Sequence, residues 1–140
     1  MHPVQILFPV VALAALTFVV LLLIPAARFR AGARGEVRSR DFAYGESASV
    51  PPRVGLPNRN LMNLLELPML FYVVCLAFYV TRSVSASAVT LAWTYVALRA
   101  AHSVIHLTYN RVSHRALVFA ASNVVLVLLW VRWAATLSAS

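Results

Sequence analysis

Three polar residues share one face of a segment that is otherwise apolar. Arg59, Asn63 and Glu66 stand at positions i, i+4 and i+7. At about 100° of rotation per residue, these positions lie within about 60° of one another on a helix. Glu66 is the single acidic residue within the apolar runs, and a carboxylate there needs a cationic or hydrogen-bonded partner or must be protonated. This face therefore offers a cation, an amide and a carboxylate.

A second polar face lies in the third apolar run. Arg99, His102, His106 and Asn110 stand at i, i+3, i+7 and i+11, and Arg115 follows at the entrance to the next apolar run. Residues three or four apart are neighbours on a helix surface. Both polar faces run toward the side on which the basic loops lie, so the sequence predicts a membrane-embedded pocket that is rich in cations.

The chemistry of this pocket suits a zwitterionic, peptide-like ligand with more negative than positive charge. Arginines bind carboxylates through paired hydrogen bonds, Glu66 suits an ammonium group and Asn63 suits an amide. Spacing alone leaves a structural alternative open. In that alternative Glu66 pairs with Arg59 or Arg99, and the polar residues only hold the helices together.

A metal or haem site is a further alternative, because His102 and His106 are four residues apart and two such imidazoles can share one metal. The segment between them lacks the glutamate of an HExxH motif. No third ligand besides Glu66 lies within the apolar runs, so we assign no metal ligand.

Four long apolar runs must position these residues. The 140-residue chain is 61% apolar and 11% charged, with a mean hydropathy of +0.80, and a helix that crosses a bilayer needs roughly 20 residues. We expect one membrane domain over residues 1–140, with helices at about 4–27, 60–81, 84–109 and 115–137 and a loop at about 28–58. The predicted fold is an all-α integral membrane protein, a four-transmembrane-helix bundle, and so short a chain favours an oligomer.

The first run and the single cysteine fit this fold. The first run starts without the Lys or Arg of a signal peptide and is longer than the usual apolar region, so we expect a retained span. Cys75 lies in the middle of the second run and is expected to behave as a small apolar residue.

The arginines predict the orientation. Seven of them lie between or beside the first two runs, and Arg111 and Arg115 lie between the last two. By the positive-inside rule these two loops face the cytoplasm and both termini face away from it, as in a bacterial inner membrane. Contact with anionic headgroups accounts for the net charge of +8, and nucleic acid is not a predicted partner because no soluble basic domain presents the charge.

Two segments resemble the MAPEG superfamily, the membrane-associated proteins in eicosanoid and glutathione metabolism. The segment from Arg59 to Pro68 is similar to that family's second-helix pattern of Arg, Asn four residues on, Glu three further and then Pro. The segment from Leu98 to Leu117 is similar to the third helix and following loop of the microsomal glutathione transferases. The length and the four spans extend the resemblance loosely to the whole chain.

The resemblance implies a homotrimer that binds glutathione between subunits near the cytoplasmic face. Arg115 stands where the family's thiol-activating arginine stands. The glutathione-binding residues implied by position are Arg28, Arg59, Asn63, Glu66, Arg99, His102 and His106. His106 departs from the family, in which a tyrosine is common, and Leu61 replaces a residue that is often polar.

The implied reaction agrees with the residue types. A thiol has an unperturbed pKa of about 8.5, and an adjacent guanidinium favours the thiolate. The resemblance therefore implies a glutathione transferase or peroxidase that acts on hydrophobic electrophiles, with membrane lipid around it. The rival interpretation is a non-catalytic structural membrane protein of the same fold.

Overall fold

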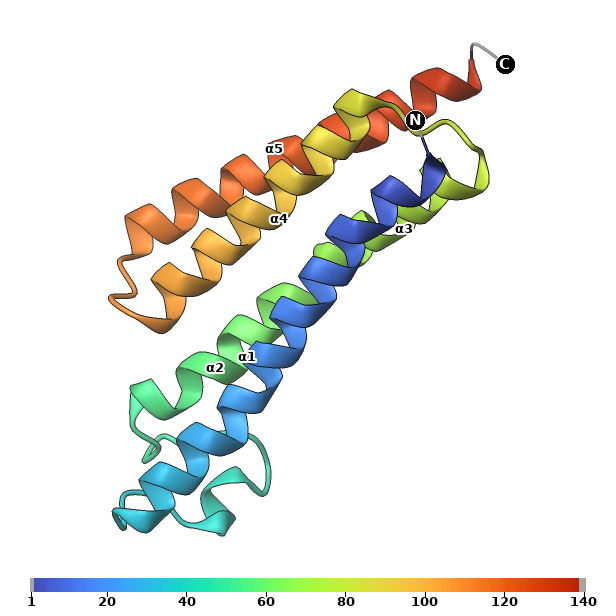
Figure 1. Ribbon diagram of the computed structural model, residues 1–140. Helices are drawn as coiled ribbons and strands as arrows, with labels where there is room; N and C mark the ends of the chain where they lie inside the picture. Colours follow the sequence, from blue (N-terminus) through green and yellow to red (C-terminus); the bar gives the residue numbers. More distant parts are fainter. Residues whose placement is uncertain (1, 139–140) are drawn as a thin grey trace.

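The structure, a computed structural model, describes residues 2–138, and these residues form helices with no strand among them. Two short 3₁₀ turns, η1 and η2, accompany five α-helices (Figure 1). In chain order the elements are η1 (Pro3–Ile6), α1 (Leu7–Ala33), η2 (Ser39–Phe42), α2 (Pro52–Leu65), α3 (Pro68–Val80), α4 (Ala86–Leu107) and α5 (Val112–Leu137).

The predicted four-span architecture is confirmed. The candidate spans are Pro3–Ala33, Pro52–Val80, Ala86–Leu107 and Val112–Leu137, so that α2 and α3 together make the second one. Even α4, with 22 residues, is about 33 Å long at a rise of about 1.5 Å per residue, which is enough to cross the hydrocarbon core. The protein is therefore an integral, multi-pass membrane protein.

The helices form two close pairs. In Figure 1, α5 runs beside α4, and α1 runs beside α2. The start of α1, the α3–α4 turn and the end of α5 lie at one end of the bundle, whereas the α4–α5 turn and the segment 34–51 lie at the other (Figure 1). The two basic loops therefore share one end, and the polar residues of α2 and α4 lie toward it.

Apolar side chains fill the centre of the bundle. Phe71 of α3 and Tyr95 of α4 are fully buried and stack with their ring centroids 4.6 Å apart. Cys75 lies in the same buried cluster and is not bridged. Large apolar side chains such as Phe18 and Val131 are exposed on the outer surface, where lipid or other protomers must cover them.

The helices extend further toward the basic end than the runs predicted. α1 continues to Ala33 rather than ending near residue 27, and α2 begins at Pro52, so the connecting segment is 34–51 and not 28–58. Hydropathy marks where a helix leaves the hydrocarbon and not where it ends, and the residues just beyond the apolar run still favour helix. Pro52 occupies the first helical position, where its missing N–H costs nothing.

Two glutamates of the segment 34–51 form ion pairs with arginines of the helices. Glu36 pairs with Arg53 of α2 at 2.6 Å, and a Glu46 oxygen lies 3.9 Å from a nitrogen of Arg28 on α1. The Glu46 carboxylate rests against Gly55 of α2, where a Cβ would collide with it. Within this segment the chain forms the 3₁₀ turn η2.

Candidate functional site

The second span is broken where its polar face meets the membrane interior. α2 ends at Leu65 and α3 begins at Pro68. Pro68 has no N–H to donate to a carbonyl in the preceding turn, and its ring crowds that turn. Across the break, the N–H of Met69 bonds to the Glu66 carbonyl at 3.2 Å. Carbonyls in the last turn of α2 are therefore available to side chains.

Arg99 uses one of these carbonyls. Its side chain on α4 is fully buried, and Nη2 donates a hydrogen bond to the carbonyl of Asn63. Its guanidinium carbon lies 5.4 Å from the centre of the Phe119 ring. Nε and Nη1 have no hydrogen-bond partner among the described residues. A buried cation with unpaired donors is costly, so this site is suited to an acceptor from outside the protomer.

Two histidines continue this face of α4. Both are buried, with their ring centroids 5.8 Å apart. His102 Nδ1 lies 3.3 Å from the carbonyl of Arg115 and donates to it. A neutral ring with its proton on Nδ1 carries its lone pair on Nε2, and this Nε2 has no partner within residues 2–138. Nδ1 of His106 is likewise buried and has no hydrogen-bond partner among the described residues.

Arg115, on α5, also lines the site. It is half-buried in the first turn of α5, and its Nη1 donates to Oδ1 of Asn110 at 2.8 Å. Asn110 has a φ of 46°, a left-handed conformation that Asn tolerates better than most residues. This bond fixes the guanidinium beside a cavity of about 220 Å³ lined by Asn63, His102, Val112, Arg115, Ala116 and Phe119.

The structure thus brings Asn63, His102 and Arg115 together and leaves other predicted residues apart. Arg59 and Glu66 are exposed. Neither has an ion pair, since those formed within residues 2–138 are the two of the 34–51 segment, and the pairing of Glu66 with Arg59 or Arg99 is absent from the described protomer. Arg28 lines a different cavity, which shares no residue with this one.

Three neighbouring residues were not singled out from the sequence. Ser103 Oγ donates to Oδ1 of Asn60 at 3.2 Å, both side chains are buried, and this bond joins α4 to α2. Phe119 packs against both Arg99 and His102. Asn60 and Ser103 carried a usable signal, because each is a polar residue inside a predicted span, next to a polar face.

The described residues contain no group of three or more His, Cys, Asp or Glu side chains placed to hold a metal ion. His102 and His106 lie side by side without a third such side chain. The polar atoms of the site are mainly donors from arginines, and donors of this kind bind anions rather than metals.

Comparison with known proteins adds the family. Neither curated proteins nor solved structures give a match. The profile of the MAPEG family matches residues 6–135, nearly the whole chain. The residues that form the site, from Arg59 to Arg115, all lie within the matched range. The chain therefore belongs to the MAPEG family, membrane proteins of the kind that serve glutathione and eicosanoid metabolism.

Proposed function

We propose that the protein binds glutathione at this site and uses its thiolate against hydrophobic electrophiles, as a glutathione transferase or a glutathione-dependent peroxidase. The observation that carries the proposal is the pair of buried, unpartnered donors on Arg99, whose side chain also bonds to Asn63, one of the residues that line the cavity with His102 and Arg115. Glutathione carries two carboxylates, one ammonium and one thiol, and the residues of the two polar faces match that set of charges.

Each residue has a role that its chemistry allows. Arg99 and Arg59 bind carboxylates of the tripeptide, and Glu66 binds its ammonium group. Asn63, His102 and His106 supply neutral hydrogen-bonding groups along the peptide. This assignment uses all the predicted residues of the two polar faces except Asn110.

Arg115 activates the thiol. A thiol with a pKa of about 8.5 is a few per cent thiolate at neutral pH, and each unit by which the pKa falls is worth about 1.4 kcal/mol. The guanidinium of Arg115, fixed by Asn110, favours the anion. In conjugation the sulfur attacks an electrophilic carbon, a C–S bond forms, and the leaving group departs or the adduct takes up a proton. In peroxide reduction the sulfur attacks a peroxide oxygen, and the O–O bond breaks, which releases the alcohol and leaves a sulfenic acid. A second glutathione then converts the sulfenic acid into the disulfide and releases water.

The hydrophobic substrate would come from the lipid side. An apolar cavity of about 310 Å³ lies between α3 and α5, lined by residues that include Leu67, Leu126 and Trp130. Leu67 is the neighbour of Glu66 in the chain. This cavity would hold the apolar part of an electrophile whose reactive group reaches the thiolate.

A second protomer would complete the glutathione site. The cavity of about 220 Å³ is smaller than the roughly 300–1,000 Å³ of typical ligand pockets. Arg59 and Glu66, about one helical turn from Asn63 on either side, are exposed and do not line it. We therefore propose a homotrimer. The basic end of the bundle would face the cytoplasm of a bacterial cell, with both termini on the other side of the inner membrane.

The test is glutathione binding to the detergent-purified protein, followed by the ultraviolet absorbance of the thiolate at neutral pH. Arg115→Ala should retain binding and lose the thiolate signal. Arg111→Ala is the matched control, because Arg111 is exposed, lies one helical turn away and does not line the cavity. Absence of binding by the wild type at millimolar glutathione would refute the proposal.

A non-catalytic membrane protein is the second candidate. The observation in its favour is that Arg99 and Ser103 both bond to α2, so that the polar faces also hold helices together. In that case Arg115→Ala would keep the assembly intact, and neither the wild type nor the variant would turn over an electrophile with glutathione.

A further inference from the structure

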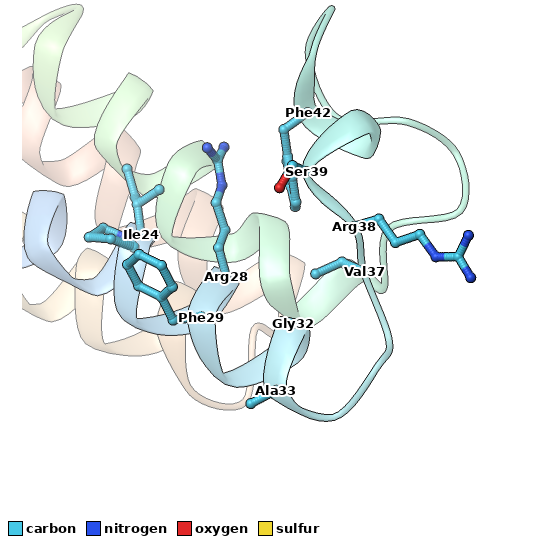
Figure 2. Close-up of a pocket in the computed structure, with 10 residues that line it drawn as sticks. Ile24, Arg28, Phe29, Gly32, Ala33, Val37, Arg38, Ser39 and Phe42 are labelled. Atoms are coloured by element: carbon cyan, nitrogen blue, oxygen red, sulfur yellow. The ribbon is translucent and has the colours of Figure 1, made fainter.

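A second cavity lies at the basic end of the bundle, away from the glutathione site. It measures about 750 Å³ and lies between the last turns of α1 and the segment 37–42 (Figure 2). The residues of α1 that line it differ in polarity: Ile24, Pro25 and Phe29 are apolar, and Arg28 is a cation. Because a helix rises about 1.5 Å per residue, the step from Ile24 to Gly32 spans about 12 Å.

The polar part of this cavity has an unused donor. The guanidinium of Arg28 lies over the Phe42 ring, 4.3 Å from its centre, and 3.9 Å from a Glu46 oxygen, which is too far for a hydrogen bond. Arg28 Nε is buried and has no partner among the described residues. Figure 2 shows Ser39 on the same side of the cavity as Phe42, and Arg38 extending away from the other labelled residues.

The apolar part faces the membrane. Ile24 and Pro25 lie one turn further into the first span than Arg28, and the Phe29 side chain is 78% exposed. A molecule that fills this cavity therefore meets hydrocarbon-like side chains on the membrane side and a cation with a hydroxyl at the membrane surface. Glycerophospholipids have this division, with acyl chains joined through glycerol to a phosphate.

The surroundings favour an anionic lipid. Two further exposed arginines follow Arg28 closely in the chain: Arg30 and Arg34. Positive charge at a membrane surface attracts anionic headgroups, and basic pockets beside membrane-spanning helices bind them. We propose that this cavity binds one anionic phospholipid of the bilayer, with its phosphate on Arg28 and Ser39 and its acyl chains against Ile24, Pro25 and Phe29.

The experiment is native mass spectrometry of the delipidated protein in a neutral detergent, with dioleoyl phosphatidylglycerol or dioleoyl phosphatidylcholine added. The wild type should bind one phosphatidylglycerol per protomer at least tenfold more tightly than phosphatidylcholine. Arg28→Gln should lose this preference. Arg40→Gln, which removes the same charge from an exposed residue that does not line the cavity, should keep it.

A second variant tests the cavity without changing any charge. Gly32 lines it, and a Cβ on Gly32 would meet no atom within 4 Å, so Gly32→Leu fills the space while the helix is retained. This variant should bind phosphatidylglycerol at least tenfold more weakly than the wild type. Free glycerol 3-phosphate should not compete, because it lacks the acyl chains.

Six outcomes would overturn the proposal. They are unchanged binding by Gly32→Leu, an equal loss in Arg40→Gln, a preference retained by Arg28→Gln, equal affinity for phosphatidylcholine, absence of any bound lipid on the wild type, and full competition by glycerol 3-phosphate. The first two would indicate general attraction to the basic end, and the last a site for a free phosphate. Absence of any bound lipid on the wild type would mean that something else, such as a second copy of the chain, covers the cavity.

Discussion

Glu66 differs from the other acidic residues in that its side chain forms no ion pair or hydrogen bond within the described residues. The chain contains four Asp and Glu residues in all. Glu36 and Glu46 lie close to arginines of the helices, and Asp41 accepts the backbone N–H of Arg38 at 2.7 Å. The acidic residues of the connecting segment are thus occupied, and Glu66 alone remains available to a cationic group from outside.

The role of Glu66 predicts a selective effect on the ammonium group of glutathione. The wild type should bind glutathione about tenfold more tightly than N-acetylglutathione, which corresponds to about 1.4 kcal/mol. Glu66→Gln should bind the two equally, because the partner of the ammonium is gone. Isothermal titration of both ligands measures this, and Glu36→Gln serves as the control that keeps the preference. A preference that persists in Glu66→Gln would assign the ammonium to another residue.

The shape of the Arg99 side chain should matter as well as its charge. Nη2 is used by the Asn63 carbonyl, and Nε and Nη1 are free. Lysine keeps the charge but cannot bond to the carbonyl and also present two further donors in the fixed planar geometry of a guanidinium. A hydrogen bond to a charged group is worth about 1.5–3 kcal/mol, so Arg99→Lys should weaken glutathione binding about tenfold to a hundredfold. The control is Arg132→Lys, at the far end of the bundle, which should not weaken glutathione binding. Equal affinities of the two variants for glutathione would contradict the role of Arg99 as a carboxylate ligand.

At the scale of elements, the break between α2 and α3 determines where the Arg99 side chain lies. A continuous helix would direct an N–H at the Asn63 carbonyl and would leave Arg99 without this acceptor. Instead the chain turns at Glu66 and Leu67, and the exposed Glu66 lies at the end of α2. Pro68 favours this break, because its ring would collide with the Leu64 carbonyl in a continuous helix. The break leaves the Asn63 carbonyl as an acceptor for the buried cation and sets the position of the carboxylate.

This dependence on Pro68 can be tested against a second proline. Pro68→Ala should weaken glutathione binding severalfold with little change in melting temperature, since proline is tolerated at the first position of α3. Pro25→Ala removes a proline from the interior of α1, where proline costs up to about 3 kcal/mol. That variant should raise the melting temperature and leave glutathione binding unchanged. The same binding in both variants would show that the break does not matter for the site.

At the scale of the whole molecule, the orientation is open to a direct measurement. Ser87 and Ser113 are exposed at opposite ends of α4 and α5, and Cys75 is fully buried. In intact cells a membrane-impermeant maleimide should label Ser87→Cys, and it should label Ser113→Cys only after permeabilisation. Labelling in the reverse order would place the basic end outside and would remove the glutathione pool of the cytoplasm from the proposed mechanism.

The sequence predicted the number of spans and the position of the polar faces, because both follow from local patterns of hydropathy and helical spacing. It did not predict the break at Glu66. Pro68 was visible, but proline within a span can kink, break or begin a helix, and packing against α4 decides among these. It also did not predict that Arg28 faces the 34–51 segment, since the fold of that segment depends on the ion pairs Arg28–Glu46 and Arg53–Glu36, which no local pattern contains.

The last prediction concerns how many copies make one site. The protomer leaves Arg59 and Glu66 exposed and outside the lining of the small cavity, and it exposes large apolar side chains along α5. A neighbouring protomer would cover both. Native mass spectrometry in detergent should therefore record the mass of three 15.4 kDa chains, and dilution into a harsher detergent should separate them with a parallel loss of glutathione binding. A monomer that binds glutathione as tightly as the assembly would contradict the shared site and would require the protomer to enclose the tripeptide alone.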